Sequence, residues 1–194
     1  MLIGLTGGIC SGKTTIARVF EGLGAVIIDL DSLGHYILKN DPLVYEQLIY
    51  SFGAGILNEK KEIDRAKLGR LVFINPDYLN TLNSIIHPPI IRLADEKSKH
   101  ELSKGRVVVL DVPLLIECNM TGMVDSVVLV YASEDTQMQR LMKRGLSKED
   151  ALSRIRSQMP FDEKKAFADF IIDTNSSLYK ANKRAKEVWK QLVS

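Results

Sequence analysis

The chain has 194 residues, 45% of them hydrophobic, which suffices for one α/β domain with insertions and a sizeable core. Its 26 Lys and Arg residues nearly balance 24 Asp and Glu residues, and a formal net charge of +2 argues against nucleic acid or a membrane as the partner. No membrane span or cleavable leader is evident, so we expect a cytoplasmic protein. Cys10 and Cys118 are too far apart for a metal or redox motif, so we expect both thiols to be reduced and neither to bind metal.

The first residues carry the most specific pattern in the chain. A hydrophobic strand, Met1 to Thr6, runs into Gly7-Gly8-Ile9-Cys10-Ser11-Gly12-Lys13-Thr14, which matches the P-loop signature G-x-x-x-x-G-K-[ST]. Ile16, Val19, Phe20 and Leu23 then recur at helical spacing, and Gly24 is a stop signal. Strand, glycine loop and helix stand in the order that phosphate binding requires.

This loop is expected to hold the phosphates of a nucleotide. Its amides and the positive end of the helix starting near Gly12 attract a polyphosphate. Lys13 would reach the β- and γ-phosphates, and the Thr14 hydroxyl would be a Mg²⁺ ligand. The expected nucleotide-binding residues here are Gly8, Cys10, Ser11, Gly12, Lys13, Thr14 and Thr15.

Residues 25–31 predict a short buried strand that ends in two acids near the loop. We expect Asp31 to be the catalytic base, because a carboxylate there could take the proton of an acceptor hydroxyl during attack on the γ-phosphate. Asp29 alternates to the other side of the strand and is the weaker candidate. The competing interpretation is that Asp31 only caps the following helix.

Residues 32–104 are rich in helix signals and predict an inserted helical lobe. Asp41-Pro42, Asp64 and Asn75-Pro76 are helix starts. His87-Pro88-Pro89 is expected to kink or break a helix, because proline removes a donor and disfavours helix in the residue before it.

Three later apolar runs, 106–111, 125–131 and 170–173, predict further strands. They are continuous rather than alternating, which is typical of a parallel sheet covered on both faces. Ligands of such sheets bind beyond the carboxyl ends of the strands. Asp111 ends its run as the acid of a Walker B strand does, where it would hold the metal or its waters; the alternative is a simple cap.

A second insertion, 136–160, is rich in Arg and Lys and is expected to be a lid. Arg140 and Arg144 lie one helical turn apart and suit phosphate oxygens; the alternative is a solvated basic face. Ser147 and Asp150 are spaced as a capping box. Residues 177–193 predict a final helix that packs on the sheet.

A compact core, a lid with arginines and an acceptor lobe favour a small-molecule kinase. A GTPase is disfavoured, because Asn182-Lys183-Arg184-Ala185 lacks the aspartate of N-K-x-D.

Several motifs together resemble the dephospho-coenzyme A kinase family. They are Leu5-Thr6-Gly7-Gly8-Ile9 with Ser11-Gly12-Lys13-Thr14, Asp29-x-Asp31, Ile86-His87-Pro88, Val112-Pro113-Leu114-Leu115 with Glu117, and Ala168-Asp169 leading to Ile172-Asp173-x-Asn175. The match spans nearly the whole chain. It implies that ATP phosphorylates the 3′-hydroxyl of dephospho-CoA, the last step of coenzyme A synthesis.

The resemblance also implies an architecture and residue roles. It implies a three-layer P-loop kinase fold with five parallel strands in the order 2-3-1-4-5. The core would contain about residues 1–31, 105–135 and 161–194, the acceptor lobe about residues 32–104 and the lid about residues 136–160. By the same resemblance Asp31 is the catalytic aspartate, Arg140 a lid arginine near ATP and Asn175 part of the adenine-side loop. His87 and Pro113, Leu114 and Leu115 would line the acceptor side.

Two residues depart from the family pattern. Cys10 stands where the family usually has glycine, and Ser176 stands where glycine often follows the asparagine. Because it has a side chain, Cys10 is required to avoid positive φ. We also hypothesise that oxidation of Cys10 inhibits the protein.

The alternatives to a dephospho-CoA kinase are a kinase for another small hydroxyl metabolite and a non-catalytic nucleotide-binding module. We expect a monomer or weak homo-oligomer.

Overall fold

The computed structural model describes the backbone of residues 1–194 and every side chain except that of Phe73. Within the described residues, five strands form one sheet in the order β2-β3-β1-β4-β5. The strands are β1 (Leu2–Gly7), β2 (Val26–Asp29), β3 (Val108–Asp111), β4 (Ser126–Tyr131) and β5 (Phe170–Asp173). Leu5 of β1 lies opposite Asp111 and Val128, in parallel register with both neighbours. The predicted parallel sheet and its strand order are confirmed.

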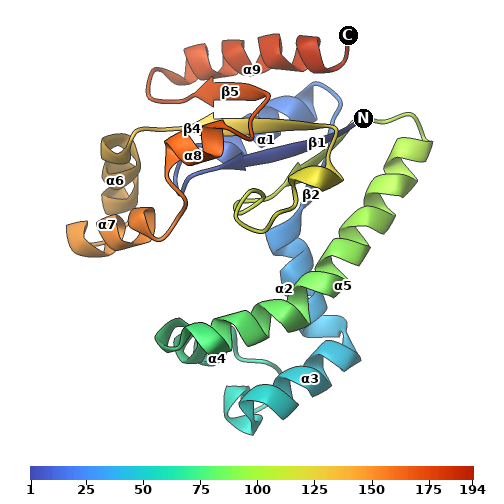
Figure 1. Ribbon diagram of the computed structural model, residues 1–194, viewed down its shortest axis with the longest axis vertical. Coiled ribbons are helices and arrows are strands. Elements are labelled where there is room, and N and C mark those ends of the chain that lie inside the picture. The colour runs from blue at the N-terminus through green and yellow to red at the C-terminus, as the bar shows by residue number, and fades with distance from the viewer. The chain divides into compact units, whose positions relative to one another are not determined.

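Helical segments separate consecutive strands along the chain (Figure 1), with runs of helices between β2 and β3 and between β4 and β5. They are α1 (Lys13–Gly22), α2 (Leu30–Asn40), α3 (Pro42–Phe52), η1 (Ala54–Ile56), α4 (Arg65–Ile74), α5 (Pro76–Ser103), η2 (Thr121–Met123), α6 (Glu134–Lys143), α7 (Lys148–Arg156), α8 (Phe161–Lys165) and α9 (Leu178–Leu192). No described helix is both long and apolar enough to cross a membrane.

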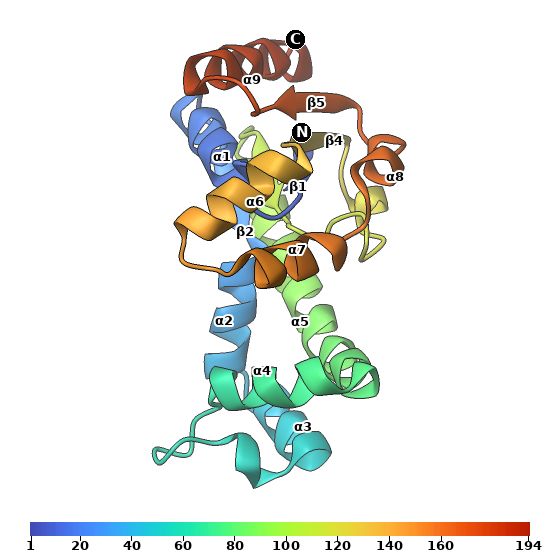
Figure 2. The ribbon, with the colours of Figure 1, turned by 90° about the vertical axis from the view of Figure 1, so that its left-hand side faces the viewer.

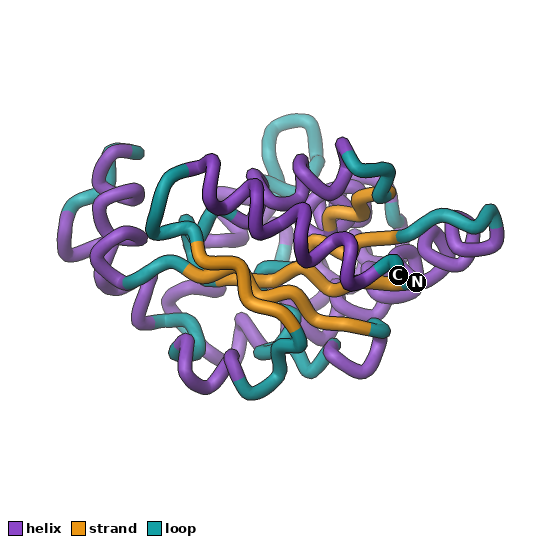
Figure 3. The backbone as a smooth tube through the Cα atoms, turned by 90° about the horizontal axis from the view of Figure 1, so that it is seen from above, coloured by secondary structure: helices purple, strands orange, loops and turns teal.

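The chain divides into two compact units, and each is described by itself. The first contains Met1–Ile28 and Ser98–Ser194, and the second contains Asp29–Lys97. The first holds the sheet, and Figure 3 shows its strands as a layer between helices. The second is built from helices.

Helices α1 and α9 cover one face of the sheet. Phe20 of α1 is fully buried, and its ring centroid lies 5.5 Å from that of Trp189 on α9. Val128 and Val130 of β4 belong to the same core, whereas Tyr131 alternates to the other face, where its ring contacts Phe161 of α8 at a centroid distance of 3.9 Å. Helices therefore cover both faces of the sheet, and the phosphate loop lies at the edge formed by the carboxyl ends of its strands. Figure 2 shows α1 and α9 next to each other.

The second unit has the predicted helix starts and one difference from prediction. Asp41 caps α3, Asp64 caps α4, and Asn75 precedes α5. The predicted strand 25–31 ends at Asp29, because Asp29 caps α2 and the chain is helical from Leu30.

Helix α5 continues through Pro88 and Pro89, which do not break it. Figure 1 shows that α5 changes direction along its length, so of the two expected outcomes, a kink or a break, the helix is kinked. Packing outweighs the missing donors here: buried Ile90 follows the prolines and lies against Gly34 of α2.

Candidate functional site

The phosphate loop joins β1 to α1 as the signature predicts. Gly12 caps α1 with φ 94°, a left-handed conformation that glycine adopts at little cost. Gly7 has no room for a side chain, because an added Cβ would lie 2.5 Å from the main-chain oxygen of Val130. The first amides of α1, at Lys13 and Thr14, precede any intrahelical acceptor and remain for a ligand.

Lys13 and Asp111 come together at this edge. The Lys13 ammonium group pairs with the Asp111 carboxylate, and the two side chains are only 15% and 10% exposed. The Asp111 carboxylate lies at the end of β3, opposite Leu5 in β1. The Thr14 hydroxyl is on the next residue of α1 and is exposed. Hydroxyl and carboxylate oxygens are ligands that Mg²⁺ accepts, so the donor set of Thr14 and Asp111 fits this metal.

Arg140 reaches the loop from α6. Its Nη1 donates to the main-chain oxygen of Cys10 at 2.9 Å and to Thr174 Oγ1 at 3.1 Å, and its Nη2 donates to the main-chain oxygen of Thr174 at 2.7 Å. Arg140 is therefore not part of a freely solvated basic face. It joins the loop to the segment after β5.

The expectation that Cys10 avoids positive φ is wrong. Its φ is 54°, in the left-handed region, where a residue with a Cβ is disfavoured by about 1 kcal/mol. The bond from Arg140 to the Cys10 oxygen helps to hold this conformation. The neighbouring Ser11 oxygen is likewise held, by the buried hydroxyl of Thr174 at 2.5 Å.

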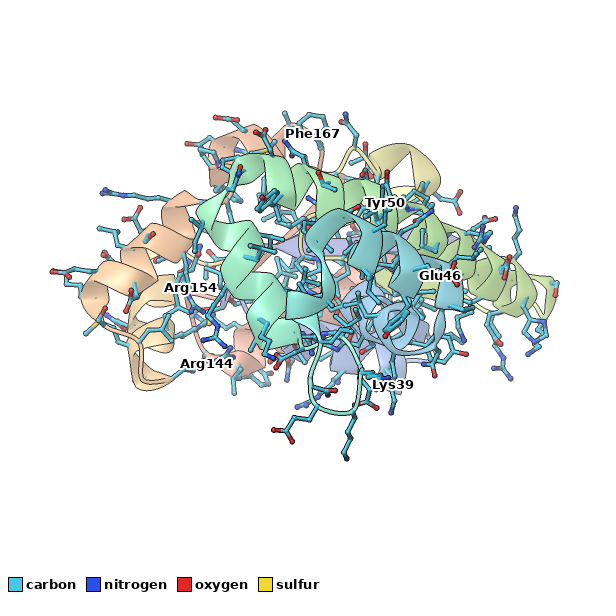
Figure 4. The ribbon with its side chains drawn as sticks, turned by 90° about the horizontal axis from the view of Figure 1, so that it is seen from below. Lys39, Glu46, Tyr50, Arg144, Arg154 and Phe167 are labelled. Carbon is cyan, nitrogen blue, oxygen red and sulfur yellow. The ribbon has the colours of Figure 1, made fainter. Side chains whose placement is uncertain are left out.

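A cavity of about 330 Å³ opens beside the loop on the α9 side. Its lining includes the loop, α6 and the start of α9: Cys10, Gly12, Thr15, Ile16, Arg140, Lys143, Arg144, Thr174, Ser176, Leu178 and Ala181. Arg144 thus shares this cavity with Arg140, as their spacing predicts. Figure 4 locates Arg144 after α6 and Arg154 on α7.

Asn175 follows β5 next to this cavity. Its Oδ1 accepts from the Ser133 amide at 2.7 Å, and its Nδ2 donates to Asp173 Oδ1 at 2.9 Å. The exposed Asn175 side chain therefore pins the loop after β5 to the start of α6, where Ser133 is the N-cap.

The segment after β3 contains the predicted acceptor-side residues of the first unit. The Pro113 oxygen accepts from Thr6 Oγ1 at 3.1 Å, while Leu114 is 41% exposed and Leu115 is fully buried. Leu114 is thus available to a ligand, whereas Leu115 packs the core. Farther on, Glu117 pairs with the buried Lys164 of α8 at 2.6 Å.

Asp31 and His87 belong to the second unit. Asp29 caps α2 by accepting from the Asp31 amide at 3.0 Å and from Ser32 Oγ at 2.7 Å. The capping role considered for Asp31 therefore falls to Asp29, and the exposed Asp31 carboxylate lies in the first turn of α2. Half-buried His87 has its pKa lowered by loss of solvation.

Sequence reasoning missed Thr174 and Gln158. Thr174 lies between Asp173 and Asn175 of a recognised motif, but at the position that the motif leaves free, and its burial is evident only in the structure. Gln158 accepts from the Ile9 amide at 2.7 Å, but it lies 149 residues away with no motif around it. Only the fold brings Gln158 to the loop.

A family model described as "Dephospho-CoA kinase" matches residues 1–180. The dephospho-CoA kinase of Carboxydothermus hydrogenoformans is 47% identical over 179 residues, covering 91% of this chain and 87% of that protein. The chain belongs to the dephospho-CoA kinase family. A second member, from Geobacillus kaustophilus, is 40% identical over 193 residues, covering 98% and 96%. The activity is dephospho-CoA kinase activity, the final step of coenzyme A biosynthesis, in an ATP-using family.

Solved structures agree with this membership. A crystal structure from Thermus thermophilus has a TM-score of 0.87 and 32% identity, covering 100% of this chain and 98% of that one. The dephospho-CoA kinase of Campylobacter jejuni has a TM-score of 0.75 and 28% identity, covering 98% and 96%. A shikimate kinase at 16% identity and a TM-score of 0.55 shares the fold.

Proposed function

We propose that the phosphate loop binds Mg-ATP and that its γ-phosphoryl group passes to the 3′-hydroxyl of dephospho-CoA. The observation that carries this assignment is the gathering of Lys13, Asp111 and Arg140 around the loop. Free amides, a lysine and a buried carboxylate beside one helix N-terminus suit a polyphosphate with its metal.

The nucleotide has a natural orientation in this site. Its phosphates lie across the amides of Lys13 and Thr14, and its base extends toward the cavity shared by Arg140, Arg144 and the Asn175 loop. Lys13 exchanges part of its pairing with Asp111 for the β- and γ-phosphates. Thr14 and Asp111 would hold Mg²⁺, which supplies positive charge to the phosphate oxygens.

Asp31 is the proposed base. Its carboxylate is exposed and does not cap α2, so it is free to accept the proton of the acceptor hydroxyl. The hydroxyl oxygen bonds to the γ-phosphorus, the bond to the β-phosphate oxygen breaks, and ADP leaves. Lys13 and Arg140 supply fixed positive charge where negative charge develops.

The remaining assignments concern the acceptor. Residues 32–104 are the proposed acceptor lobe, with His87 on the substrate side together with Pro113 and Leu114, whereas Leu115 is buried and supports this segment from the core. Residues 136–160 are the proposed lid. The structure of this second insertion is a helix pair, α6 and α7, with Ser147 capping α7 by accepting from the Asp150 amide at 3.1 Å.

The test is ADP release from Mg-ATP with and without dephospho-CoA, with the product examined for one added phosphate at the 3′ position. ADP formation that depends on dephospho-CoA and yields that product supports the proposal. A phosphorylated product with only another hydroxyl metabolite would assign a different acceptor. Tight ATP binding without transfer to any acceptor would indicate a non-catalytic module.

A further inference from the structure

Two side chains from outside the phosphate loop hold its first turn. Gln158, between α7 and α8, accepts the Ile9 N–H with its Oε1 at 2.7 Å. Arg140 of α6 donates to the Cys10 oxygen at 2.9 Å. These two bonds hold the two ends of the Ile9–Cys10 segment, one at the Ile9 N–H and the other at the Cys10 oxygen.

The turn held by these bonds contains a disfavoured conformation. The Ser11 amide bonds to the Gly8 oxygen at 3.0 Å and closes a four-residue turn. Its third residue, Cys10, has φ 54°, a position where such turns favour glycine. A cysteine therefore needs outside support here that a glycine would not need.

The bond to Gln158 does not compete with a phosphate at the helix start. It occupies the Ile9 N–H, whereas the phosphate-binding amides proposed above are those of Lys13 and Thr14. Gln158 is half-buried, so its bond is partly shielded from water. Its contribution is to the shape of the loop.

We propose that Gln158 is a positioning residue for ATP: it holds the Gly8–Ser11 turn in the conformation that Cys10 disfavours and so keeps the following amides in place. This inference rests on the proposed role of the loop in phosphate binding. It assigns Gln158 no contact with the substrate. It also makes the need for Gln158 depend on the residue at position 10.

The first experiment replaces the acceptor group. Gln158→Met keeps the unbranched side chain and removes the bond, so we expect the dissociation constant for ATP, measured by calorimetry, to rise about fivefold. The KM for dephospho-CoA should stay within about twofold, since the turn belongs to the nucleotide site. Gln139→Met, at an exposed position on α6, is the matched control and should leave both unchanged.

The decisive experiment repeats Gln158→Met in a Cys10→Gly background. Because glycine adopts positive φ at little cost, the loss of ATP affinity should shrink to less than about twofold there. An equal loss in both backgrounds would mean a general structural role and would overturn the proposal. So would an unchanged ATP dissociation constant in Gln158→Met, or a change confined to dephospho-CoA.

Two further variants keep the result interpretable. If Gln158→Met fails to fold, Gln158→Glu takes its place, because glutamate retains an acceptor for the Ile9 N–H. Any loss of ATP affinity in Gln158→Glu must then be equal in the Cys10 and Cys10→Gly backgrounds. A background-dependent loss would overturn the proposal. Lys13→Ala must weaken ATP binding in the same assay. Unaltered ATP binding in Lys13→Ala would mean that the phosphate-site assignment itself is wrong, rather than the role of Gln158.

Discussion

The ammonium group of Lys13, at the first residue of α1, pairs with the carboxylate of Asp111 at the end of β3. Both side chains are largely buried, so water screens the pair less than a surface pair. Under the proposed function, a polyphosphate would meet a lysine whose charge is already positioned by this pair.

Lys13→Ala should weaken both ATP binding and turnover. The variant loses the proposed contact to the β- and γ-phosphates, and it removes the positive charge that pairs with the Asp111 carboxylate. We expect kcat/KM to fall by about 10²- to 10³-fold. Steady-state kinetics and calorimetry with ATP measure this, with Lys190→Ala on α9 as the control. Unaltered kinetics in Lys13→Ala would refute the phosphate-loop assignment.

Asp31→Asn should lower kcat by about 10²- to 10⁴-fold and leave ATP affinity nearly intact, because it removes a base without touching the loop. Asp29→Asn is the matched control. Asparagine caps helices about as well as aspartate, so that variant should keep both its fold and its turnover. Near-wild-type turnover in Asp31→Asn would remove Asp31 from the role of base.

The sequence predicted the elements better than the contacts between them. The P-loop and the last helix, with Ala181, Ala185 and Val188 buried, are confirmed because periodicity and spacing specify them locally. The strand order is also confirmed, but it came from the family resemblance and not from local patterns. The continuity of α5 through Pro88 and Pro89 and the positive φ of Cys10 depend on distant partners: Ile90 packs on Gly34, and Arg140 binds the loop. Local propensity does not report such partners.

The same distinction between local patterns and long-range contacts applies to the site. Lys13 and Asp111 could be placed together because the carboxyl ends of parallel strands share one edge of the sheet. Gln158 and Thr174 could not, because their roles arise from hydrogen bonds to main-chain groups and leave no motif in the sequence. Asp31 remains a proposal.

Alkylation should distinguish the two cysteines. Burial, assisted by the charge of Glu117, raises the pKa of the Cys118 thiol, so its reactive thiolate is scarce at neutral pH. Cys10 lines the cavity beside Gly12. We expect iodoacetamide to modify Cys10 first and to inhibit the enzyme, with ATP protecting it. The Cys118→Ser variant isolates the Cys10 reaction, and full activity after stoichiometric modification of Cys10, checked by mass, would contradict this prediction.

His87 should make the stability depend on pH. Burial lowers its pKa below the value of about 6.5 in the unfolded chain. The unfolded state therefore binds the proton more readily, and folding stability should fall as pH drops through 6.5 toward the folded-state pKa. Urea unfolding at pH 7.5 and pH 5.5 measures this loss. It should be smaller in His87→Gln and unchanged in His35→Gln, whose site is exposed; equal losses in all three proteins would exclude His87 as the cause.

The pair of Glu117 and Lys164 should matter for stability. Lys164 is 2% exposed, and Glu117 lies 2.6 Å from its ammonium group, joining the segment after β3 to α8. Glu117→Leu leaves a buried charge without its counterion and should lower the free energy of unfolding by about 3 kcal/mol.

Removing both charges tests whether the pair or the packing is responsible. The double variant Glu117→Leu with Lys164→Met has no buried charge, so it should recover most of the stability lost in Glu117→Leu alone. Urea unfolding of the two single variants and the double variant gives the coupling free energy. Additive losses would show that the two charges act independently. The contact between the segment after β3 and α8 would then be stabilised by side-chain packing alone.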